Sequence, residues 1–188
     1  MAWRGKQLVD GDGVARVLMH LRGERLRLRA AREEDCRLLW EWANDPEVRS
    51  VSFSSDPIPW VHHVQWFKSK LASAYCQILV AIDGNERPVG QVRFDINGKE
   101  AIISVSVDRK FRGKGLGTEM IRLATQQFFN NSDVDVIHAY IKSDNKASVK
   151  AFKKAGFEFI GKTDVKGHEA LHFVLQRNGS QDENEQSY

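Results

Sequence analysis

A glycine-rich segment in the second half of the chain constrains the fold more than any other feature. It reads Arg112-Gly-Lys-Gly-Leu-Gly117, it follows an alternating apolar stretch at 101–108, and it opens an apolar stretch at 115–130. The alternation is typical of a strand, and the longer periodic stretch is typical of a helix. Free backbone N–H groups at such a helix start, together with the helix dipole, favour an anion. The segment therefore predicts an α/β domain with an anion site at a strand–helix junction.

The spacing of the glycines narrows the kind of anion site. A P-loop needs four residues between its first glycine and a Gly-Lys-Ser/Thr sequence, which this segment lacks. A dinucleotide fingerprint needs G-x-G-x-x-G, whereas Gly113, Gly115 and Gly117 give G-x-G-x-G, and no suitable acidic residue follows a second strand. The pattern that remains is R-x-x-G-x-G, from Arg112 to Gly117, directly after a strand.

The order of the other elements predicts a mixed sheet. Asn97-Gly98 is a strong signal for a hairpin, and Gly156 suits the end of a helix. An antiparallel meander, two strand–helix units and a closing hairpin together indicate an α/β domain with a mixed sheet. We expect helices at 33–43, 61–71, 115–130 and 145–155, and strands at 26–29, 77–83, 88–96, 101–108, 136–141, 157–163 and 169–176.

Composition excludes several other classes of protein. The chain has 188 residues with 41% hydrophobic and 28% charged residues, as in ordinary globular proteins. A net charge of +3 is too small to indicate nucleic-acid binding, and no apolar run is long enough for a membrane helix. Without a signal peptide we expect a cytoplasmic protein, in which Cys36 and Cys76 form no disulfide framework and no metal is bound. The expected layout is an N-terminal extension at 1–24, one domain at 25–176 and a disordered tail at 177–188.

A second motif lies roughly 30 residues after the glycine loop. Asn145 to Phe157 follows the pattern N-x-x-S-x-x-x-[YF]-x-K-x-G-F. The two motifs together resemble the GNAT (GCN5-related N-acetyltransferase) family over about residues 25–176. The resemblance implies a mostly antiparallel central sheet flanked by helices, in which two parallel strands splay apart to admit acetyl-CoA. It also implies an enzyme, an acyltransferase that moves an acetyl group onto an amine.

The resemblance also assigns residues to the cofactor. The strand at 101–108 would pair with pantetheine, the glycine loop would hold the pyrophosphate, and the later helix would contact the pantetheine arm. Asn145 suits a helix N-cap equally well. Many relatives carry at position 152 a tyrosine that protonates the departing thiolate, but Phe152 has no proton to give. The residues assigned to the cofactor are Val105, Val107, Arg112, Gly113, Lys114, Gly115, Leu116, Gly117, Thr118, Asn145, Ser148 and Phe152.

Candidates for proton transfer lie on a helix and on a strand. His62 and His63 begin the predicted helix at 61–71, and imidazole accepts a proton near neutral pH. Ser106 lies on the side of its strand that is opposite to the apolar row, where a hydroxyl could order a water or the acceptor. Surface or structural roles are the alternative for all three residues.

Two aromatic motifs resemble the amino-sugar branch of the same family. They are W-x-N-D-P-x-V-R at 42–49 and H-x-x-W-F at 63–67. Those enzymes acetylate the 4-amino group of a UDP-linked dideoxy sugar on the way to pseudaminic acid. The segment at 7–17 is similar to the end of the nucleotide-sugar hydrolase of that pathway. The resemblance implies that Trp42, Arg49, Trp66 and Arg93 contact a UDP-amino sugar, although Trp42 also suits a core position.

Two other functions stay open at the level of sequence. The H-x-x-W-F region also resembles enzymes that acetylate the N-terminal amine of ribosomal proteins. A CoA-binding module without turnover is the second alternative, because Phe152 removes the common proton donor. The expected partners are a small-molecule acceptor and neither nucleic acid nor membrane, and a homodimer is compatible with this assignment.

Overall fold

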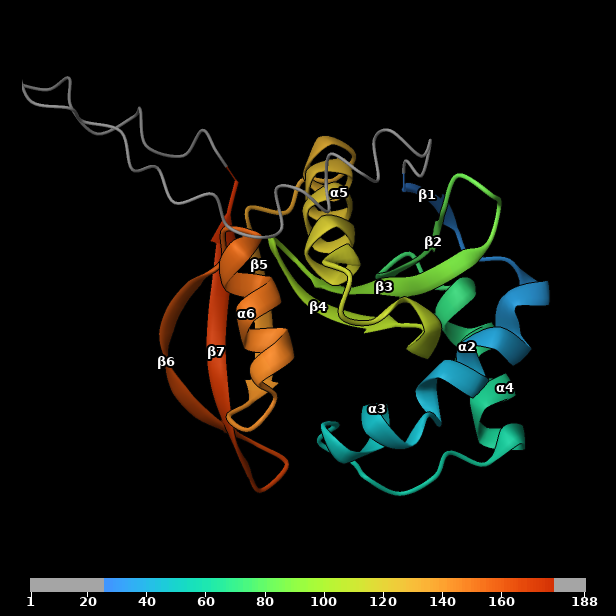
Figure 1. Ribbon diagram of the computed structural model, residues 1–188. Helices are drawn as coiled ribbons and strands as arrows, with labels where there is room; N and C mark the ends of the chain where they lie inside the picture. Colours follow the sequence, from blue (N-terminus) through green and yellow to red (C-terminus); the bar gives the residue numbers. More distant parts are fainter. Residues whose placement is uncertain (1–25, 178–188) are drawn as a thin grey trace, which may run out of the picture.

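The computed structural model describes residues 26–177 (Figure 1). The expected N-terminal extension, the hydrolase-like segment at 7–17 and all but the first residue of the expected tail lie outside the described residues. No helix within 26–177 is long and apolar enough to cross a membrane.

A seven-stranded sheet organises the described chain, in the order β1-β2-β3-β4-β5-β7-β6. Every neighbouring pair is antiparallel except β4 and β5, which run parallel. This arrangement confirms the expected mixed, mostly antiparallel sheet flanked by helices. The strands are β1 (Arg27–Ala30), β2 (Cys76–Ile82), β3 (Pro88–Asn97), β4 (Glu100–Val107), β5 (Val136–Lys142), β6 (Glu158–Val165) and β7 (His168–Gln176).

Helices cover both faces of the sheet. In Figure 1, α5 and α6 lie apart from the group formed by α2, α3 and α4. The helices are α2 (Cys36–Ala43), α3 (Pro46–Ser50), α4 (Trp60–Leu71), α5 (Leu116–Asn130) and α6 (Lys146–Lys154), with short 3-10 turns η1 (Glu33–Asp35) and η2 (Arg109–Phe111).

The alternation of β2 decides which helices it contacts. Leu79 and Ala81 belong to the main core, which also contains α5 residues such as Met120. Ile78, Val80 and Ile82 face the other way, into a second core cluster with Leu39, Trp42 and Phe67 from α2 and α4. Because successive side chains of a strand point to opposite faces, one apolar strand supports both helical layers.

The parallel pair separates soon after it forms. Pairing between β4 and β5 runs only from Glu100 with Val136 to Ile102 with His138. Beyond Ile102, β4 keeps its pairing with β3 as far as Val107. Figure 1 shows β5, β6 and β7 turning away from β3 and β4. The expected splayed pair of parallel strands is therefore confirmed.

Helix α3 was missed by the sequence analysis, which expected no helix between 43 and 61. Asn44 caps the end of α2, and Asp45 and Pro46 start α3. The Asp45 side chain accepts hydrogen bonds from the backbone of Glu47 and Val48, and Pro46 occupies the first helical position. An acidic N-cap followed by proline is a favourable helix start.

Candidate active site

Two adjoining cavities lie along the part of β4 that extends beyond its pairing with β5. We call the first, of about 360 Å³, the loop cavity, because the glycine loop and α6 line it. The second, of about 480 Å³, is called the aromatic cavity and is lined by α2, α3, α4, β3 and β4. Both are lined by Val48, Val105 and Ser106, so the two cavities meet at these residues. Two ligands could therefore approach each other at this junction.

Backbone geometry makes the loop cavity suitable for an anion. Gly113 and Gly115 have φ angles of +75° and +79°, and a Cβ added to either would meet no atom within 4 Å. Gly115 is the N-cap of the 15-residue helix α5. No backbone acceptor among residues 26–177 takes the N–H groups of 113–117. Free amides at the start of a long helix fit the pyrophosphate of a nucleotide cofactor such as CoA.

The residues assigned to the cofactor line the loop cavity, with one exception. Lys114 does not line it, because its ammonium lies over the Phe111 ring, 5.4 Å from the ring centroid. Two lysines of α6, Lys150 and Lys154, line the cavity although the sequence analysis did not single them out. Both lie within the Asn145 motif, in which Lys154 is the K position, so the motif could have indicated them.

The Arg112 guanidinium is not free, because it is hydrogen-bonded to groups on β4 and at the start of α3. Its Nη1 donates to Asp45 (3.0 Å) and Glu47 (2.5 Å), and its Nε donates to the carbonyl of Val107 (3.0 Å). Burial alone would lower the pKa of the Arg112 guanidinium, but the hydrogen bonds to the two carboxylates raise it above its ordinary value. Arg112 therefore ties the glycine loop to the start of α3, and its contact with the cofactor stays a prediction.

Helix α6 closes the loop cavity with a capped end and an apolar wall. The Asn145 side chain accepts a hydrogen bond from the Ser148 amide at 3.1 Å, so the N-cap role is realised. Phe152 is buried edge-to-face against Phe157, with ring centroids 5.0 Å apart. No tyrosine is among the residues that line either cavity within the described chain. Among the described residues, therefore, no cavity-lining tyrosine takes the place of the hydroxyl that Phe152 lacks.

The aromatic cavity contains two guanidinium groups, and no aspartate or glutamate of the described chain lines it. Arg49 donates to the Ser54 carbonyl (3.0 Å) and to the Ser52 hydroxyl (3.1 Å), and its buried Nε has no partner. Burial lowers the pKa of Arg49. A partly buried cation without a carboxylate partner favours an anionic ligand.

Arg93 is held more firmly than Arg49. Its Nε donates to Asp95 at 2.8 Å, and Asp95 also accepts from Lys70 at 2.6 Å. The guanidinium lies over the Trp66 ring, 5.3 Å from the ring centroid, and Nη2 donates to Ser104 at 3.3 Å. Arg93 and Trp66 thus form one fixed, flat surface on the cavity wall.

The structure restricts what His63 can do. Its side chain is buried, and Nε2 donates to the Cys36 carbonyl at 3.1 Å, which leaves Nδ1 for proton transfer. Burial lowers the pKa of His63, since the charged form is desolvated. The ring is also stacked on Phe67 at 5.9 Å. A structural role is thus realised, and catalysis by His63 stays a prediction, as it does for the exposed His62 that also lines the cavity.

The structure realises the core position for Trp42, and its contact with the acceptor stays a prediction. Trp42 is 6% exposed in the second core cluster and lines neither cavity. Its indole N–H donates to Asp108 at 2.8 Å, just before η2. Trp42 therefore anchors α2 to the end of β4. Trp66 lines the aromatic cavity, as do Arg49, Arg93 and Ser106.

Gln91 lines the aromatic cavity but was missed by the sequence analysis. It lies directly opposite Ser106 in the β3–β4 ladder. The predicted Asn97-Gly98 turn would pair 96 with 99 and bring 91 opposite 104. The observed turn is at 98–99, so Asn97 pairs with Glu100 and 91 lies opposite 106.

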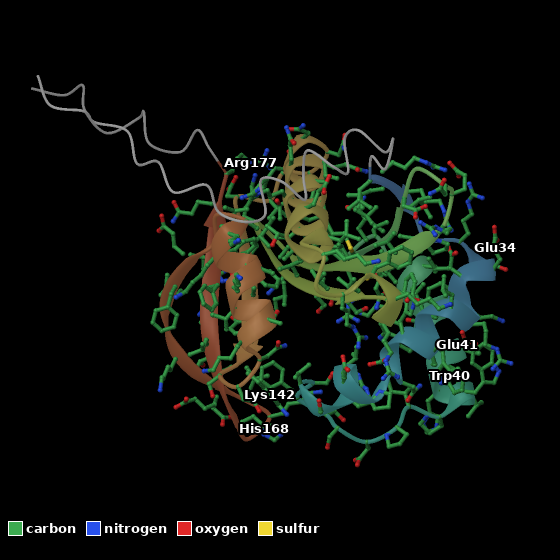
Figure 2. All side chains as sticks on the ribbon, viewed as in Figure 1. Glu34, Trp40, Glu41, Lys142, His168 and Arg177 are labelled. Carbon is green, nitrogen blue, oxygen red and sulfur yellow. The ribbon has the colours of Figure 1, made fainter. Side chains whose placement is uncertain are left out.

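The hairpin formed by β6 and β7 ends near α3. Figure 2 shows His168 at the end of the β6–β7 hairpin, close to α3, whereas Trp40 lies on α2, farther from this hairpin. The Phe53 ring lies 6.4 Å from the His168 ring. Trp40 donates instead to the Ile58 carbonyl at 2.8 Å, which fixes the loop between α3 and α4. The segment at 51–59 is thus held by a ring contact at Phe53 and by a hydrogen bond at Ile58.

Comparison with known proteins relates this geometry to transferases. A family model described as an acetyltransferase (GNAT) domain matches residues 25–158. The chain is 25% identical to an aminoglycoside N(6')-acetyltransferase type 1 of Klebsiella pneumoniae, over 80% of this chain and 82% of that protein.

Two solved structures share the fold. An aminoglycoside acetyltransferase in complex with coenzyme A and kanamycin has a TM-score of 0.72 at 22% identity, covering 81% of this chain and 95% of the other. Spermidine N-acetyltransferase from Vibrio cholerae, in complex with CoA and spermine, has a TM-score of 0.72 at 18% identity, covering 80% and 95%.

Proposed function

Since the chain belongs to the GNAT family of acetyltransferases and is an acyltransferase that uses acetyl-CoA, we propose that its acceptor is the 4-amino group of a UDP-linked amino sugar. Acetyl-CoA would occupy the loop cavity, with its pyrophosphate at the amides of 113–117. The acceptor would occupy the aromatic cavity. The reacting atoms would meet at the junction formed by Val48, Val105 and Ser106.

One observation carries the choice of acceptor, namely the charge of the aromatic cavity. Arg49 and Arg93 line it, and among the described residues no carboxylate does. Kanamycin and spermine, which are bound to the related structures, are polycations near neutral pH. A wall of guanidinium groups repels a polycation and attracts a diphosphate. The charge therefore favours an amine on an anionic carrier.

The shape of the cavity suits a nucleotide-linked sugar. Its volume of about 480 Å³ lies in the range of small-molecule sites. Trp66 with Arg93 over its ring offers a flat surface for stacking a uracil or a sugar. Arg49, without a carboxylate partner, would take a phosphate oxygen through its free Nε.

The reaction needs an oriented amine and a stabilised oxyanion. Beyond Ile102 the edge of β4 that faces β5 has no strand partner, so its backbone groups are available to the thioester. One amide hydrogen bond to a developing oxyanion contributes about 3 kcal/mol. The thiolate of CoA is a good leaving group, which lessens the need for the proton donor that Phe152 cannot supply.

The test compares acceptors of opposite charge. The purified protein is incubated with acetyl-CoA and a UDP-4-amino sugar, kanamycin, spermine or a peptide with a free N-terminal amine, and released thiol and acetylated product are measured. We expect the highest kcat/KM with the UDP-amino sugar.

Acetylation of kanamycin or spermine with equal or higher kcat/KM would contradict the proposed acceptor. Preference for the peptide would favour the N-terminal acetyltransferase alternative. A thermal shift with acetyl-CoA but no thiol release with any amine would favour a CoA-binding module without turnover.

A further inference from the structure

Two polar side chains at the junction of the cavities have no partner in the described structure. They are Gln91 on β3 and Ser106 on β4, which lie directly opposite each other in the antiparallel ladder. Gln91 Oε1 and Ser106 Oγ are both buried, and neither has a hydrogen-bond partner. Gln91 lines only the aromatic cavity, whereas Ser106 lines both cavities.

Unpaired buried oxygens at such a place indicate a ligand. Buried polar atoms in native proteins nearly always have a partner, so the exceptions need an explanation. Directly opposed residues of an antiparallel pair have Cβ atoms about 5 Å apart, close enough for both side chains to contact one ligand atom. Here the two oxygens face the place where the acceptor must approach the thioester.

A primary amine that receives the acetyl group can use both oxygens, because each oxygen can accept a hydrogen bond from one of its N–H groups. A neutral primary amine has two N–H groups and one lone pair. If two oxygens accept the two N–H groups, the lone pair is left to attack the thioester carbonyl. An ammonium ion has a third N–H and no lone pair, so it cannot react.

The surrounding charges disfavour the ammonium form. The charged or titratable groups that line the aromatic cavity are Arg49 on α3, His62 and His63 on α4, and Arg93 on β3. Across the junction, the loop cavity is lined by Lys150 and Lys154, and by Arg112, whose charge is paired with Asp45 and Glu47. Within residues 26–177 no carboxylate lines either cavity. Like charges nearby make the protonated amine less stable than the neutral one.

We propose that Gln91 and Ser106 orient the neutral form of the acceptor amine, Gln91 Oε1 accepting one N–H and Ser106 Oγ the other. The inference rests on the proposed function, in that it places acetyl-CoA in the loop cavity and the amine in the aromatic cavity. The nitrogen lone pair forms the new C–N bond and the C–S bond breaks. The nitrogen loses one proton, and the departing sulfur gains one.

The test replaces Gln91 by its isosteric acid. In Gln91→Glu a carboxylate meets the amine and stabilises its ammonium form. We expect kcat/KM for the acceptor at pH 7 to fall about tenfold, and the acidic limb of its pH profile to move up by about one unit. Activity at high pH should return toward the wild-type value. Acetyl-CoA affinity should stay unchanged, because Gln91 does not line the loop cavity.

The matched control is Gln77→Glu on β2, where Gln77 pairs with Phe94 and lines neither cavity. This variant makes the same chemical change and should leave the pH profile in place. An acidic limb of Gln91→Glu that stays fixed, or moves to lower pH as for an added general base, would overturn the inference.

A second pair of variants tests the hydroxyl. Ser106→Ala should lower kcat/KM about tenfold while acetyl-CoA still shifts the melting temperature, and Ser106→Thr should restore most of the loss. Wild-type activity in Ser106→Ala would contradict the inference.

The outcomes separate the two proposals. Rejection of the UDP-amino sugar, with acetylation of another amine, contradicts the proposed acceptor alone, and the pH profiles are then measured with that amine. An unshifted profile contradicts the role of Gln91 alone. Absence of thiol release with every amine contradicts both.

Discussion

The loop cavity and the aromatic cavity adjoin each other but are built in different ways. The loop cavity uses glycine backbone amides from 113–117 and the capped start of α6, which are short continuous stretches of chain. The aromatic cavity uses side chains that five separate elements bring together. In the proposed assignment, local backbone geometry provides the site for the cofactor, while tertiary packing provides the site for the acceptor. Substitutions should therefore affect the two cavities by different mechanisms.

The largest expected effect comes from breaking the ion pair between Arg29 and Asp35 at the start of α2. Asp35 is buried at the start of α2 and accepts from both Nη atoms of Arg29 (2.7 and 2.8 Å) and from the Arg32 amide (2.7 Å). Burial alone would raise the pKa of Asp35, but these hydrogen bonds lower it below its ordinary value. Because breaking a buried pair leaves a charge uncompensated, Asp35→Asn should reduce the free energy of unfolding at pH 7 by about 3 kcal/mol.

The pH dependence of this loss has a defined sign. A lowered folded-state pKa gives stability that is present above the unfolded-state pKa, about 3.9, and is lost as the pH falls through the folded value. Urea unfolding of wild type and Asp35→Asn should therefore converge below pH 4. The control is Asp56→Asn, in the exposed loop before α4. A difference of constant size from pH 7 to pH 3 would contradict the assignment.

The next effect tests the charge of the aromatic cavity. Arg49→Met removes the guanidinium without a carboxylate partner and keeps most of the side-chain length. Losing one charged hydrogen bond to a buried anion costs about 2 kcal/mol, so KM for an anionic acceptor should rise roughly thirtyfold. The Kd of acetyl-CoA should stay the same.

The matched control is Arg37→Met on the outer side of α2, where the guanidinium lies over Trp60 at 4.6 Å. Steady-state kinetics should show a rise in KM for the anionic acceptor with Arg49→Met and little change with Arg37→Met. An equal rise in KM for the two would mean that general surface charge, not Arg49, attracts the acceptor.

A smaller effect should appear on the cofactor side. Gly115→Ala places a methyl group beside the free amides and forces a left-handed φ of +79° on a residue with a Cβ. The strain costs about 1 kcal/mol, and together with the added bulk it should raise the Kd of acetyl-CoA about tenfold. KM for the acceptor should change little.

Gly98→Ala is the control for strain alone. Its φ is +61°, a Cβ there would also meet no atom within 4 Å, and it lies in the β3–β4 hairpin away from both cavities. Calorimetry with acetyl-CoA should detect no change in Kd for this variant. If both variants weaken binding equally, the loop amides are not the pyrophosphate site.

The smallest effect concerns the thiols behind the aromatic cavity. Burial and the nearby charge of Asp95 raise the pKa of Cys76 to about 11, and burial raises that of Cys36. Cys76 should therefore stay protonated at pH 8 and react with a disulfide reagent at least about tenfold more slowly than in urea, and Cys36 should also be slowed. Rapid reaction of the folded protein would mean that the Asp95 network beside Arg93 is open.

The local elements of the fold could be predicted from the sequence because their signals are local. Alternation, the Asn97-Gly98 turn and the glycine loop located the strands and the long helix to within one or two residues. Helix α3 was missed because five residues after a proline carry little periodicity. Its start depends on hydrogen bonds to the Asp45 side chain, and this residue lies just after the expected end of the preceding helix, so a new helix start was not recognised there.

The sequence by itself determined the loop cavity, because glycines with positive φ, a helix start and an Asn cap act within a few residues of one another. Only the tertiary structure decided the aromatic cavity. It placed Trp42 in the core and Trp66 at the cavity, engaged Nε2 of His63 with Cys36, and paired Arg112 with α3. It also brought Gln91 beside Ser106 with both oxygens unpaired. Strand alternation fixes which side chains share a face, but the helix that covers this face is set by contacts far apart in the chain.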